Sequence, residues 1–467
     1  MIQLELNSDI RFKAADLPAP VLETIERRLT MANPKYAENE KYGRWQGDTE
    51  PELHFVEYIG GHDGLVVRIP RGFIYQLLGI LKQYGIKHEI ANHTTVHEPV
   101  SFTFTGKLFK HQKKALDAIL SKKYGVLQAP TGSGKTVIGL AAVAERKQPT
   151  LIVVHTKELL YQWQDRAIQY LGLDKEEIGL IGNGYKSIGL LTIGIKNTLV
   201  NVIEGIKDRF GFIIVDECHH TPAATFMDVV GRLSAAYMLG LSATPYRKDK
   251  LTRVIYFYLG DKIHEIETAD LQESGHILKA QLEIIETGWD YQYSDDYSSM
   301  ILELTEDEVR NEIILEAVLG QLQADRGIAL VLSDRKDHCR YLHNQLIGEG
   351  VRAALLLGDM PKKERAAIVD GLRAGEYRAL VATASLIGEG FDLPDISSIF
   401  LTVPVKFSGR LTQYVGRALR TVEGKTEARV FDFVDQNPIL RHSFKSRLNT
   451  YSRMGIKAEA ASVVAGQ

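Results

Sequence analysis

The sequence predicts an α/β protein in which a small N-terminal α+β domain precedes two tandem parallel-sheet domains. The chain has 467 residues, and a typical domain of about 150 residues suggests about three domains. From about Phe102 onward, short apolar runs alternate with helical patterns, and a second such series begins after about Gly275. Uninterrupted apolar strands between helices indicate parallel sheets that are covered on both faces.

Composition sets limits on the class of protein. Hydrophobic residues make up 45% of the chain and charged residues 25%, as in ordinary globular proteins. The formal net charge of −3 does not indicate a nucleic-acid partner, so such a partner would need a local basic groove. The two cysteines, Cys218 and Cys339, are too few for a disulfide scaffold. With no signal peptide or membrane span in the sequence, we expect a cytoplasmic protein without a membrane partner.

The N-terminal domain is predicted to span residues 1–100. Strand patterns at residues 3–6 and 65–69 accompany amphipathic helical patterns at residues 21–31 and 72–84. Tyr36, Tyr42 and Trp45 are interleaved with basic residues, a combination that can hold nucleic acid by charge and stacking. A solvated charged face is the alternative interpretation. Residues 93–98 contain two histidines four apart, but β-branched neighbours and Pro99 favour an extended linker over a metal site.

The first parallel-sheet domain is predicted at residues 101–275 and the second at residues 276–455, followed by a tail at 456–467. Strands are expected at 125–128, 151–154 and 212–215 in the first domain. In the second domain they are expected at 327–332, 353–357, 380–382, 398–402 and 430–433. Residues 305–308 (TEDE) resemble a capping box that starts a helix through Leu322.

The strongest motif is a phosphate-binding loop with the sequence APTGSGKT at residues 129–136. It follows an apolar strand and opens a helical pattern, which is the context in which such a motif binds nucleotide phosphates. Glycines let backbone amides turn toward the phosphates, and the helix N-terminus adds a favourable dipole. Lys135 should reach the β- and γ-phosphates, and the Thr136 hydroxyl should ligate Mg²⁺. The predicted loop residues are Thr131, Gly132, Ser133, Gly134, Lys135 and Thr136.

A pair of acids follows the apolar strand at residues 212–215. A carboxylate at the end of a parallel strand, facing a phosphate-binding loop, supplies the acidic partner that Mg²⁺ needs. Asp216 is predicted to take that role, and Glu217 to orient and polarise the attacking water as the general base. A solvated acidic strand end would be the alternative if the loop were absent.

These motifs, followed by SAT at residues 242–244, resemble motifs I, II and III of the superfamily-two helicases. Residues 381–394 (VATASLIGEGFDLP) resemble motif V, and residues 413–420 (QYVGRALR) resemble motif VI. The resemblance covers about Phe102 to Met454, and it implies two RecA-like domains. It is strongest to XPB-like and phage-type branched-DNA helicases, which also resemble restriction-enzyme motors. The run SATPYRKD at 242–249 and the strand VFDFVD at 430–435, with Arg447 and Tyr451 beyond it, carry that likeness.

The resemblance implies ATP and Mg²⁺ as cofactors and assigns further residues to the nucleotide site. Gln112 would contact the adenine edge. Arg417 and Arg420 would act as arginine fingers on the γ-phosphate, which are worth about 10³–10⁵ in rate in related nucleotide hydrolases. Ser242 and Thr244 would link the site to domain motion. Residues expected to line the same cleft and couple it to the nucleic-acid track are Gln413, Glu389 and Asp392.

The resemblance also implies a track that contacts the nucleic-acid backbone. Thr156 corresponds to motif Ia, Ser333 and Arg335 to motif IV, and Thr383 to motif V. Hydroxyls and backbone amides suit phosphate contacts that do not depend on base sequence. For each residue alone, an ordinary loop position is the alternative.

The sequence therefore predicts an ATP-dependent DNA helicase or translocase that acts in repair, recombination or genome defence. DNA is favoured over RNA because the likeness is to DNA-directed helicases and because motif II is DECH rather than DEAD. Two alternatives stay open. One is an RNA helicase, and the other is an ATP-switched motor subunit of a restriction or other complex, with a nuclease on another chain.

Overall fold

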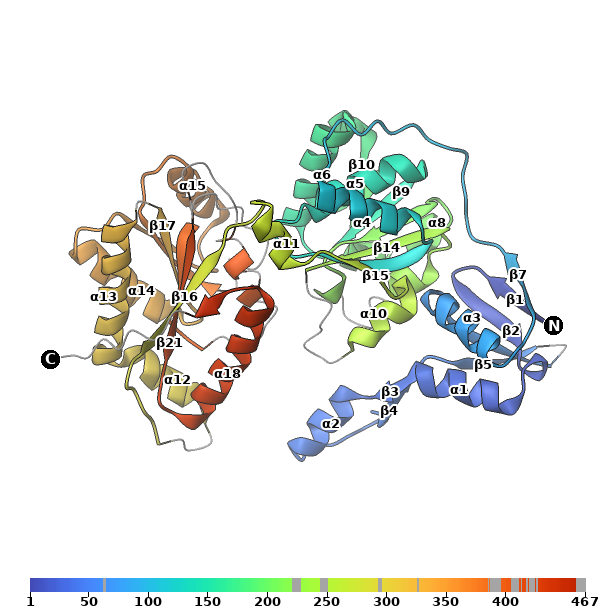
Figure 1. Cartoon of the computed structure of the whole chain (residues 1–467), viewed down its shortest axis with the longest axis horizontal. Coiled ribbons are helices and arrows are strands. Elements are labelled where there is room, and N and C mark those ends of the chain that lie inside the picture. Colours follow the sequence, from blue (N-terminus) through green and yellow to red (C-terminus); the bar gives the residue numbers. More distant parts are fainter. Residues whose placement is uncertain are drawn as a thin grey trace. The chain divides into compact units, whose positions relative to one another are not determined.

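The computed structural model describes residues 1–61, 64–220, 228–243, 251–292, 296–325, 327–384, 386, 396–404, 411–412, 414–416, 419, 425 and 427–458. The chain divides into two compact units (Figure 1). The first consists of Met1–Ala129 and Gly134–Ile266, and the second of Pro130–Ser133 and Glu267–Gln467. The domain bounds predicted from the sequence stay a prediction.

The first unit begins with a five-stranded sheet in the order β5-β6-β2-β1-β7. Only β1 and β7 pair in parallel, and the other neighbours are antiparallel. In β1 the burial alternates strictly because one face of the sheet packs against helices. The strands are β1 (Ile2–Leu6), β2 (Asp9–Lys13), β5 (Glu57–Gly61), β6 (Gly64–Pro70) and β7 (His88–Asn92). The helices are α1 (Ala19–Leu29) and α3 (Ile74–Gln83), while α2 (Pro34–Lys41) lies beside the separate pair β3 (Thr30–Ala32) and β4 (Glu52–His54).

A larger sheet follows in the same unit, with eight strands among the described residues, in the order β11-β10-β12-β9-β13-β14-β8-β15. All pairs are parallel except β10 with β11. The strands are β8 (Tyr124–Gln128), β9 (Thr150–Val154), β10 (Ile178–Gly182), β11 (Tyr185–Lys186), β12 (Leu191–Ile195), β13 (Phe212–Val215), β14 (Tyr237–Ser242) and β15 (Lys262–Glu265). The helices are α4 (Lys110–Leu120), α5 (Lys135–Arg146), α6 (Lys157–Leu171), α7 (Lys196–Leu199), α8 (Ile203–Ile206) and α10 (Thr252–Leu259).

The N-terminal sheet and the larger sheet share one continuous apolar core. Phe257 of α10 packs against Phe55 and Phe73, with ring centroids 5.1 and 6.3 Å apart. Arg71 is fully buried between them, and its guanidinium donates hydrogen bonds to the carbonyls of Leu233 (2.9 Å) and Ala235 (2.7 Å). Because this arginine spans from one sheet to loops of the other, the first 92 residues are anchored to the larger sheet.

The second unit contains a parallel sheet of seven strands within its described part, in the order β18-β19-β17-β20-β21-β16-β22. The strands are β16 (Ala280–Glu286), β17 (Ile328–Ser333), β18 (Ala353–Leu356), β19 (Ala379–Thr383), β20 (Ile396–Leu401), β21 (Ala428–Val434) and β22 (Lys457–Ala458). The helices are α11 (Thr268–Glu273), α12 (Tyr297–Glu306), α13 (Glu308–Ala324), α14 (Lys336–Gly348), α15 (Lys362–Arg373) and α18 (Pro438–Arg453). Along the chain, a small α+β sheet is followed by two sheets of mainly parallel strands with helices between them. This confirms the predicted fold class.

The two faces of β21 pack against different helices. Phe431 and Phe433 belong to a core shared with α13 and α14. Asp432 points to the other face, where it accepts two hydrogen bonds from the Arg447 guanidinium (2.7 and 2.8 Å) and one from the Tyr451 hydroxyl (2.7 Å). Burial and the neighbouring Asp432 charge raise the pKa of Tyr451. The residues that marked the late part of the resemblance therefore fix α18 on the sheet.

Two local predictions need correction. The first helix ends at Leu29 rather than at residue 31, because Thr30–Ala32 pairs with β4 as a strand. The helix expected to start from a capping box at Thr305 instead starts at Glu308, and Asp307 is its N-cap, accepting from the Arg310 amide (2.7 Å). Thr305 lies in the preceding helix, where its hydroxyl donates to the Ile301 carbonyl (3.0 Å). An aspartate competes well with threonine as an N-cap.

The linker around His93 is extended, as predicted, and Thr95 forms an isolated bridge with Ala235. No group of histidines, cysteines or acids that could hold a metal ion occurs within the ranges that the structure describes. Among the helices of those ranges, none combines the length and the apolar character needed to cross a membrane.

Candidate nucleotide-binding site

The predicted ATP-site residues that belong to the first unit lie at the carboxyl edge of its larger sheet. The phosphate-binding loop follows β8, and Asp216 and Glu217 follow β13. β14, which ends at Ser242, lies between those two strands. Because parallel strands all end at the same edge, three segments far apart in sequence meet there.

The loop conformation depends on its glycines. Gly132 and Gly134 have φ angles of 89° and 80°, a left-handed region that is costly for other residues. Gly134 is also the N-cap of α5, and a Cβ atom there would lie 2.3 Å from the Gln112 side-chain nitrogen. Side-chain space and backbone conformation therefore both require glycine at this position. Thr131 is half-buried, Gly132 is exposed, and the Ser133 amide donates to the Pro130 carbonyl (3.2 Å).

Lys135 is held at the start of α5 by contacts of its ammonium within the first unit. Its Nζ donates to the Ala129 carbonyl (3.1 Å) and lies 3.5 Å from Glu217 Oε1. The side chain is only 12% exposed, so the charge is partly removed from water. A partly buried ammonium beside a glycine-rich loop and a helix N-terminus is an arrangement that attracts phosphate oxygens.

Glu217 has an unusual backbone conformation, and its carboxylate lies beside Lys135. Its φ angle of 43° is rare for a residue with a side chain, and such outliers concentrate at functional sites. Oε2 lies 3.3 Å from His219 Nδ1 and 3.4 Å from the Ala243 amide, which donates to it. The carboxylate is thus positioned by contacts on two strand ends while 17% of the side chain stays exposed.

Asp216 is buried directly behind Glu217. Its Oδ1 accepts from the Glu217 amide (2.9 Å), and its Oδ2 accepts from the indole nitrogen of Trp163 (2.7 Å). Burial, followed by the charge of Glu217, raises the pKa of Asp216 to about 6, although the Trp163 hydrogen bond acts in the opposite direction. A cation at this carboxylate would relieve the cost of burying its charge.

Trp163 is a site residue that the sequence analysis missed. It lies on α6, 53 positions before Asp216 in the chain, and its side chain is almost fully buried. A Cβ at Gly139 of α5 would lie 2.8 Å from the Trp163 ring. The indole therefore fills a slot that a helix glycine leaves open. The available signal was a tryptophan on the apolar face of the helix that follows motif Ia.

The donors fit ATP and Mg²⁺ by their chemistry. Asp216 offers carboxylate oxygens and Thr136, in the first turn of α5, offers a hydroxyl, and Mg²⁺ prefers oxygen ligands of this kind.

Motifs II and III are connected directly in the structure. A hydrogen bond of 2.8 Å joins His219 Nδ1 to the buried Ser242 hydroxyl. Gln112 accepts from the Phe109 amide (3.0 Å) through Oε1, and its amide nitrogen is directed at Gly134. Gln112 thus braces the loop at the start of α5, and its predicted adenine contact stays a prediction.

The predicted nucleic-acid contacts differ in their environments. Thr156 is the N-cap of α6, and its hydroxyl accepts from the Leu159 amide (3.2 Å). It therefore lies at a helix N-terminus, a position that favours phosphate contacts. Arg335 is half-buried, and its guanidinium donates to the Ser298 carbonyl (3.2 Å). Thr383 is 6% exposed, and its hydroxyl has no hydrogen-bond partner among the residues placed by the structure.

Ser333 lies in a buried hydrogen-bond network. It is fully buried, its hydroxyl accepts from the Arg335 amide (3.1 Å), and it bonds to His338 Nδ1 (3.0 Å). His338 also bonds to Asn311 (2.9 Å), and burial lowers the pKa of His338 to about 3. In this structure Ser333 shapes the turn before Arg335, and its predicted phosphate contact stays a prediction.

Several predicted residues lie outside the described part of the chain. They are Thr244, Glu389, Asp392, Gln413, Arg417 and Arg420. The roles assigned to them stay predictions.

Two family models match the chain. The description "Type III restriction enzyme, res subunit" fits residues 105–247, and "Helicase conserved C-terminal domain" fits residues 310–422. The first match contains the residues assigned to motifs I to III, and the second contains those assigned to motifs IV, V and VI.

Named relatives of this chain include a DNA translocase and a probable helicase. A protein of Sulfurisphaera tokodaii named "DNA 3'-5' translocase XPB2" is 25% identical over 383 residues, which cover 73% of this chain and 85% of that protein. "Probable helicase D10" of Escherichia phage T5 is 24% identical over 402 residues, which cover 85% and 86%. Three other helicase relatives are longer, and the alignments cover 52% to 59% of their lengths.

A solved structure shares the fold. The Pyrococcus furiosus Hef helicase domain aligns with a TM-score of 0.52 at 16% identity, and the match covers 72% of this chain and 97% of that domain. At this identity the likeness concerns the fold alone.

Proposed function

We propose that this chain, which belongs to the superfamily-two helicases, is a DNA translocase that uses ATP hydrolysis to move along or remodel DNA. The observation that carries the proposal is the arrangement at the sheet edge of the first unit. Lys135 lies 3.5 Å from Glu217, and Asp216 is buried directly behind it. This arrangement supplies a phosphate-binding cation, a base and a metal-binding acid together.

The chemistry of hydrolysis follows from these positions. Lys135 would bind the terminal phosphates, and Glu217 would orient a water and accept its proton. Thr136 and Asp216 would hold Mg²⁺, which supplies charge neutralisation to the phosphates when bound. Lys135 and Glu217 pair with each other in the structure, so nucleotide binding would exchange that contact for one with phosphate.

DNA is the favoured track because the relatives support it. The archaeal relative is named a DNA 3'-5' translocase. Phosphate contacts from the N-terminus of α6 and from Arg335 would hold the backbone without reading bases. We include 3'-5' polarity in the proposal on the same ground. A role in repair, recombination or genome defence, with a nuclease partner on another chain, is the wider setting we infer.

The test is steady-state ATP turnover, measured alone and with single-stranded, duplex and forked DNA and with RNA of matched length. We expect strong stimulation by DNA and loss of turnover in Lys135→Ala, while Lys175→Ala, at an exposed lysine of the first unit, should behave as wild type. Forks with a single 3' or 5' tail test the polarity.

Each unfavourable outcome has a definite meaning. Stimulation by RNA alone would reject the DNA assignment while keeping the motor. Robust turnover in Lys135→Ala would reject the site. Turnover that no nucleic acid stimulates would favour an ATP-driven conformational switch for a partner protein.

A further inference from the structure

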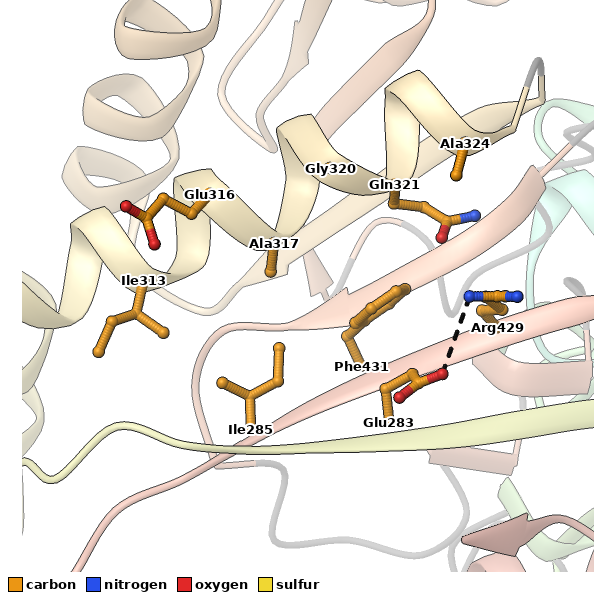
Figure 2. A pocket seen from close by; sticks show the side chains of 10 residues that line it. All are labelled: Glu283, Ile285, Ile313, Glu316, Ala317, Gly320, Gln321, Ala324, Arg429 and Phe431. Carbon is orange, nitrogen blue, oxygen red and sulfur yellow. Dashed lines mark ion pairs between the residues drawn. The ribbon is translucent and has the colours of Figure 1, made fainter. Parts of the chain in front are cut away.

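A groove lies on the sheet of the second unit, between α13 and the strands β16 and β21. Its volume is about 330 Å³. Figure 2 shows Ile285 and Phe431 pointing from the strands toward the helix above them. The residues lining it are Glu283, Ile285, Ile313, Glu316, Ala317, Gly320, Gln321, Ala324, Arg429 and Phe431.

The groove exists because one side of α13 carries small residues. Ala317, Gly320 and Ala324 are three and four positions apart, so they line one face of the helix. A Cβ atom at Gly320 would meet no atom within 4 Å. The glycine therefore does not serve a close internal contact, and the space beside it is open.

The floor of the groove is part of the apolar core of the second unit. Ile285 and Phe431 are only 6% and 8% exposed and pack with the core beneath α13 and α14. Phe431 stacks on Phe400, with ring centroids 4.3 Å apart. A large apolar side chain entering from outside would thus meet a rigid aromatic surface, as the central pockets of protein interfaces provide.

The charged residues that line the groove are Glu283, Glu316 and Arg429, and a row of glutamates continues from Glu316 along α13. Arg429 lies 3.8 Å from Glu283 at one end and also donates hydrogen bonds to Glu427. Along α13, the exposed residues Glu308, Glu312 and Glu316 are four positions apart. None of these three forms an ion pair with any residue whose position is described. Like charges at this spacing destabilise a helix. Glu308, in the first turn, also interacts favourably with the helix dipole, whereas Glu312 and Glu316 lie beyond that turn.

We propose that this groove binds an amphipathic segment of a partner protein, with large apolar side chains for the floor and lysines or arginines for the row of glutamates. An acidic rim repels nucleic-acid phosphates, so the partner is a protein segment rather than DNA or RNA. A helix or peptide that lays an apolar face into a groove is a common recognition mode. The proposal goes beyond the motor activity and does not depend on it.

The test uses the full chain and a defined probe. The probe is a fluorescein-labelled synthetic peptide that carries tryptophan and leucine at helical spacing, flanked by lysines. The control peptide has the same apolar residues flanked by glutamates. Binding is followed by fluorescence anisotropy. We expect saturable binding of the lysine peptide and none of the glutamate peptide at the same concentrations.

Two pairs of variants locate the binding. Gly320→Phe fills the groove, and Gly79→Phe is its matched control, because Gly79 is also an exposed helical glycine with nothing within 4 Å of its Cβ. The double change Glu312→Lys with Glu316→Lys reverses the rim, and Glu23→Lys changes an exposed glutamate of α1. We expect about tenfold or greater weakening from each groove variant and no change from each control.

The outcomes separate clearly. Equal peptide affinity in Gly320→Phe and wild type, with unchanged thermal unfolding, would overturn the proposal, as would a failure of wild type to bind the lysine peptide. Salt-sensitive binding that the rim reversal leaves intact would place the peptide elsewhere and also overturn it. If sedimentation shows that wild type dimerises and Gly320→Phe does not, a second copy of this chain occupies the groove instead.

Discussion

Replacing Trp163 with phenylalanine isolates the hydrogen bond that this residue gives to Asp216. Phenylalanine keeps an aromatic ring in the slot beside Gly139 but removes the indole N–H, which lies 2.7 Å from Asp216 Oδ2. The buried carboxylate then loses a donor that supports its charged form. We expect the charged form of Asp216 to become less stable, without any change to Lys135 or Glu217.

The size of the effect follows from the strength of that bond. A hydrogen bond to a charged group contributes roughly 1.5–3 kcal/mol, and about 1.4 kcal/mol corresponds to a tenfold change in equilibrium constant. At a pH below the pKa of Asp216, where protons compete with the metal, the apparent affinity for Mg²⁺ should therefore fall by roughly 10- to 100-fold. The same loss raises the pKa of Asp216 further above its value of about 6. The acid limb of kcat/KM against pH should move upward by about 1 to 2 pH units.

The assay is ATP turnover titrated with Mg²⁺ across pH, accompanied by thermal unfolding. Trp289→Phe is the control, because Trp289 is a partly buried tryptophan of the second unit that stacks on Tyr291. A double-mutant cycle with Asp216→Asn, read as the free energy of unfolding, measures the coupling between the two side chains.

One result would refute the reasoning. If Trp163→Phe lowers thermal stability but leaves both the Mg²⁺ dependence and the acid limb at their wild-type positions, Trp163 is a packing residue only. A coupling energy below about 0.5 kcal/mol in the cycle would support the same conclusion.

Three further predictions concern Asp216, Arg71 and Asp432. Burial raises the pKa of Asp216 to about 6, so ATP turnover at limiting Mg²⁺ should fall as the pH drops through about 6, and excess Mg²⁺ should restore it. Arg71→Met leaves two buried carbonyls without their donor and should lower the free energy of unfolding by roughly 1–3 kcal/mol for each, as measured by urea unfolding. An unchanged unfolding midpoint would contradict the anchoring role. Asp432→Ala removes the partner of buried Arg447 and should lower stability by about 3–5 kcal/mol by calorimetry, and a loss under 1 kcal/mol would contradict it.

The sequence predicted the phosphate-binding loop because the signal is local. Glycines, lysine and threonine occupy adjacent positions between a strand and a helix, so their chemistry does not depend on distant residues. The parallel sheets were predicted for a similar reason, because uninterrupted apolar strands cannot face water. Strand positions agreed with the structure to within one or two residues, for example at Phe212–Val215.

Other features depend on contacts between residues far apart in the chain. The Ser333 hydroxyl is buried against His338 by the packing of α13 and α14, and the few residues around Ser333 do not encode that contact. The cap of α13, by contrast, is a local feature: it lies at Asp307 rather than Thr305 because the preceding helix continues through Glu306.

By itself, the sequence determined the nucleotide chemistry, the order of the motifs and the class of fold. The first two depend on neighbouring residues, and the fold class depends on strand and helix periodicity. Only the tertiary structure decided that Trp163 holds Asp216, that Arg71 joins the N-terminal sheet to the larger one, and that α13 leaves a groove over Phe431. The physical reason is that burial, hydrogen-bond partners and unfilled volume are set by which surfaces meet, and the chain must fold before those surfaces exist.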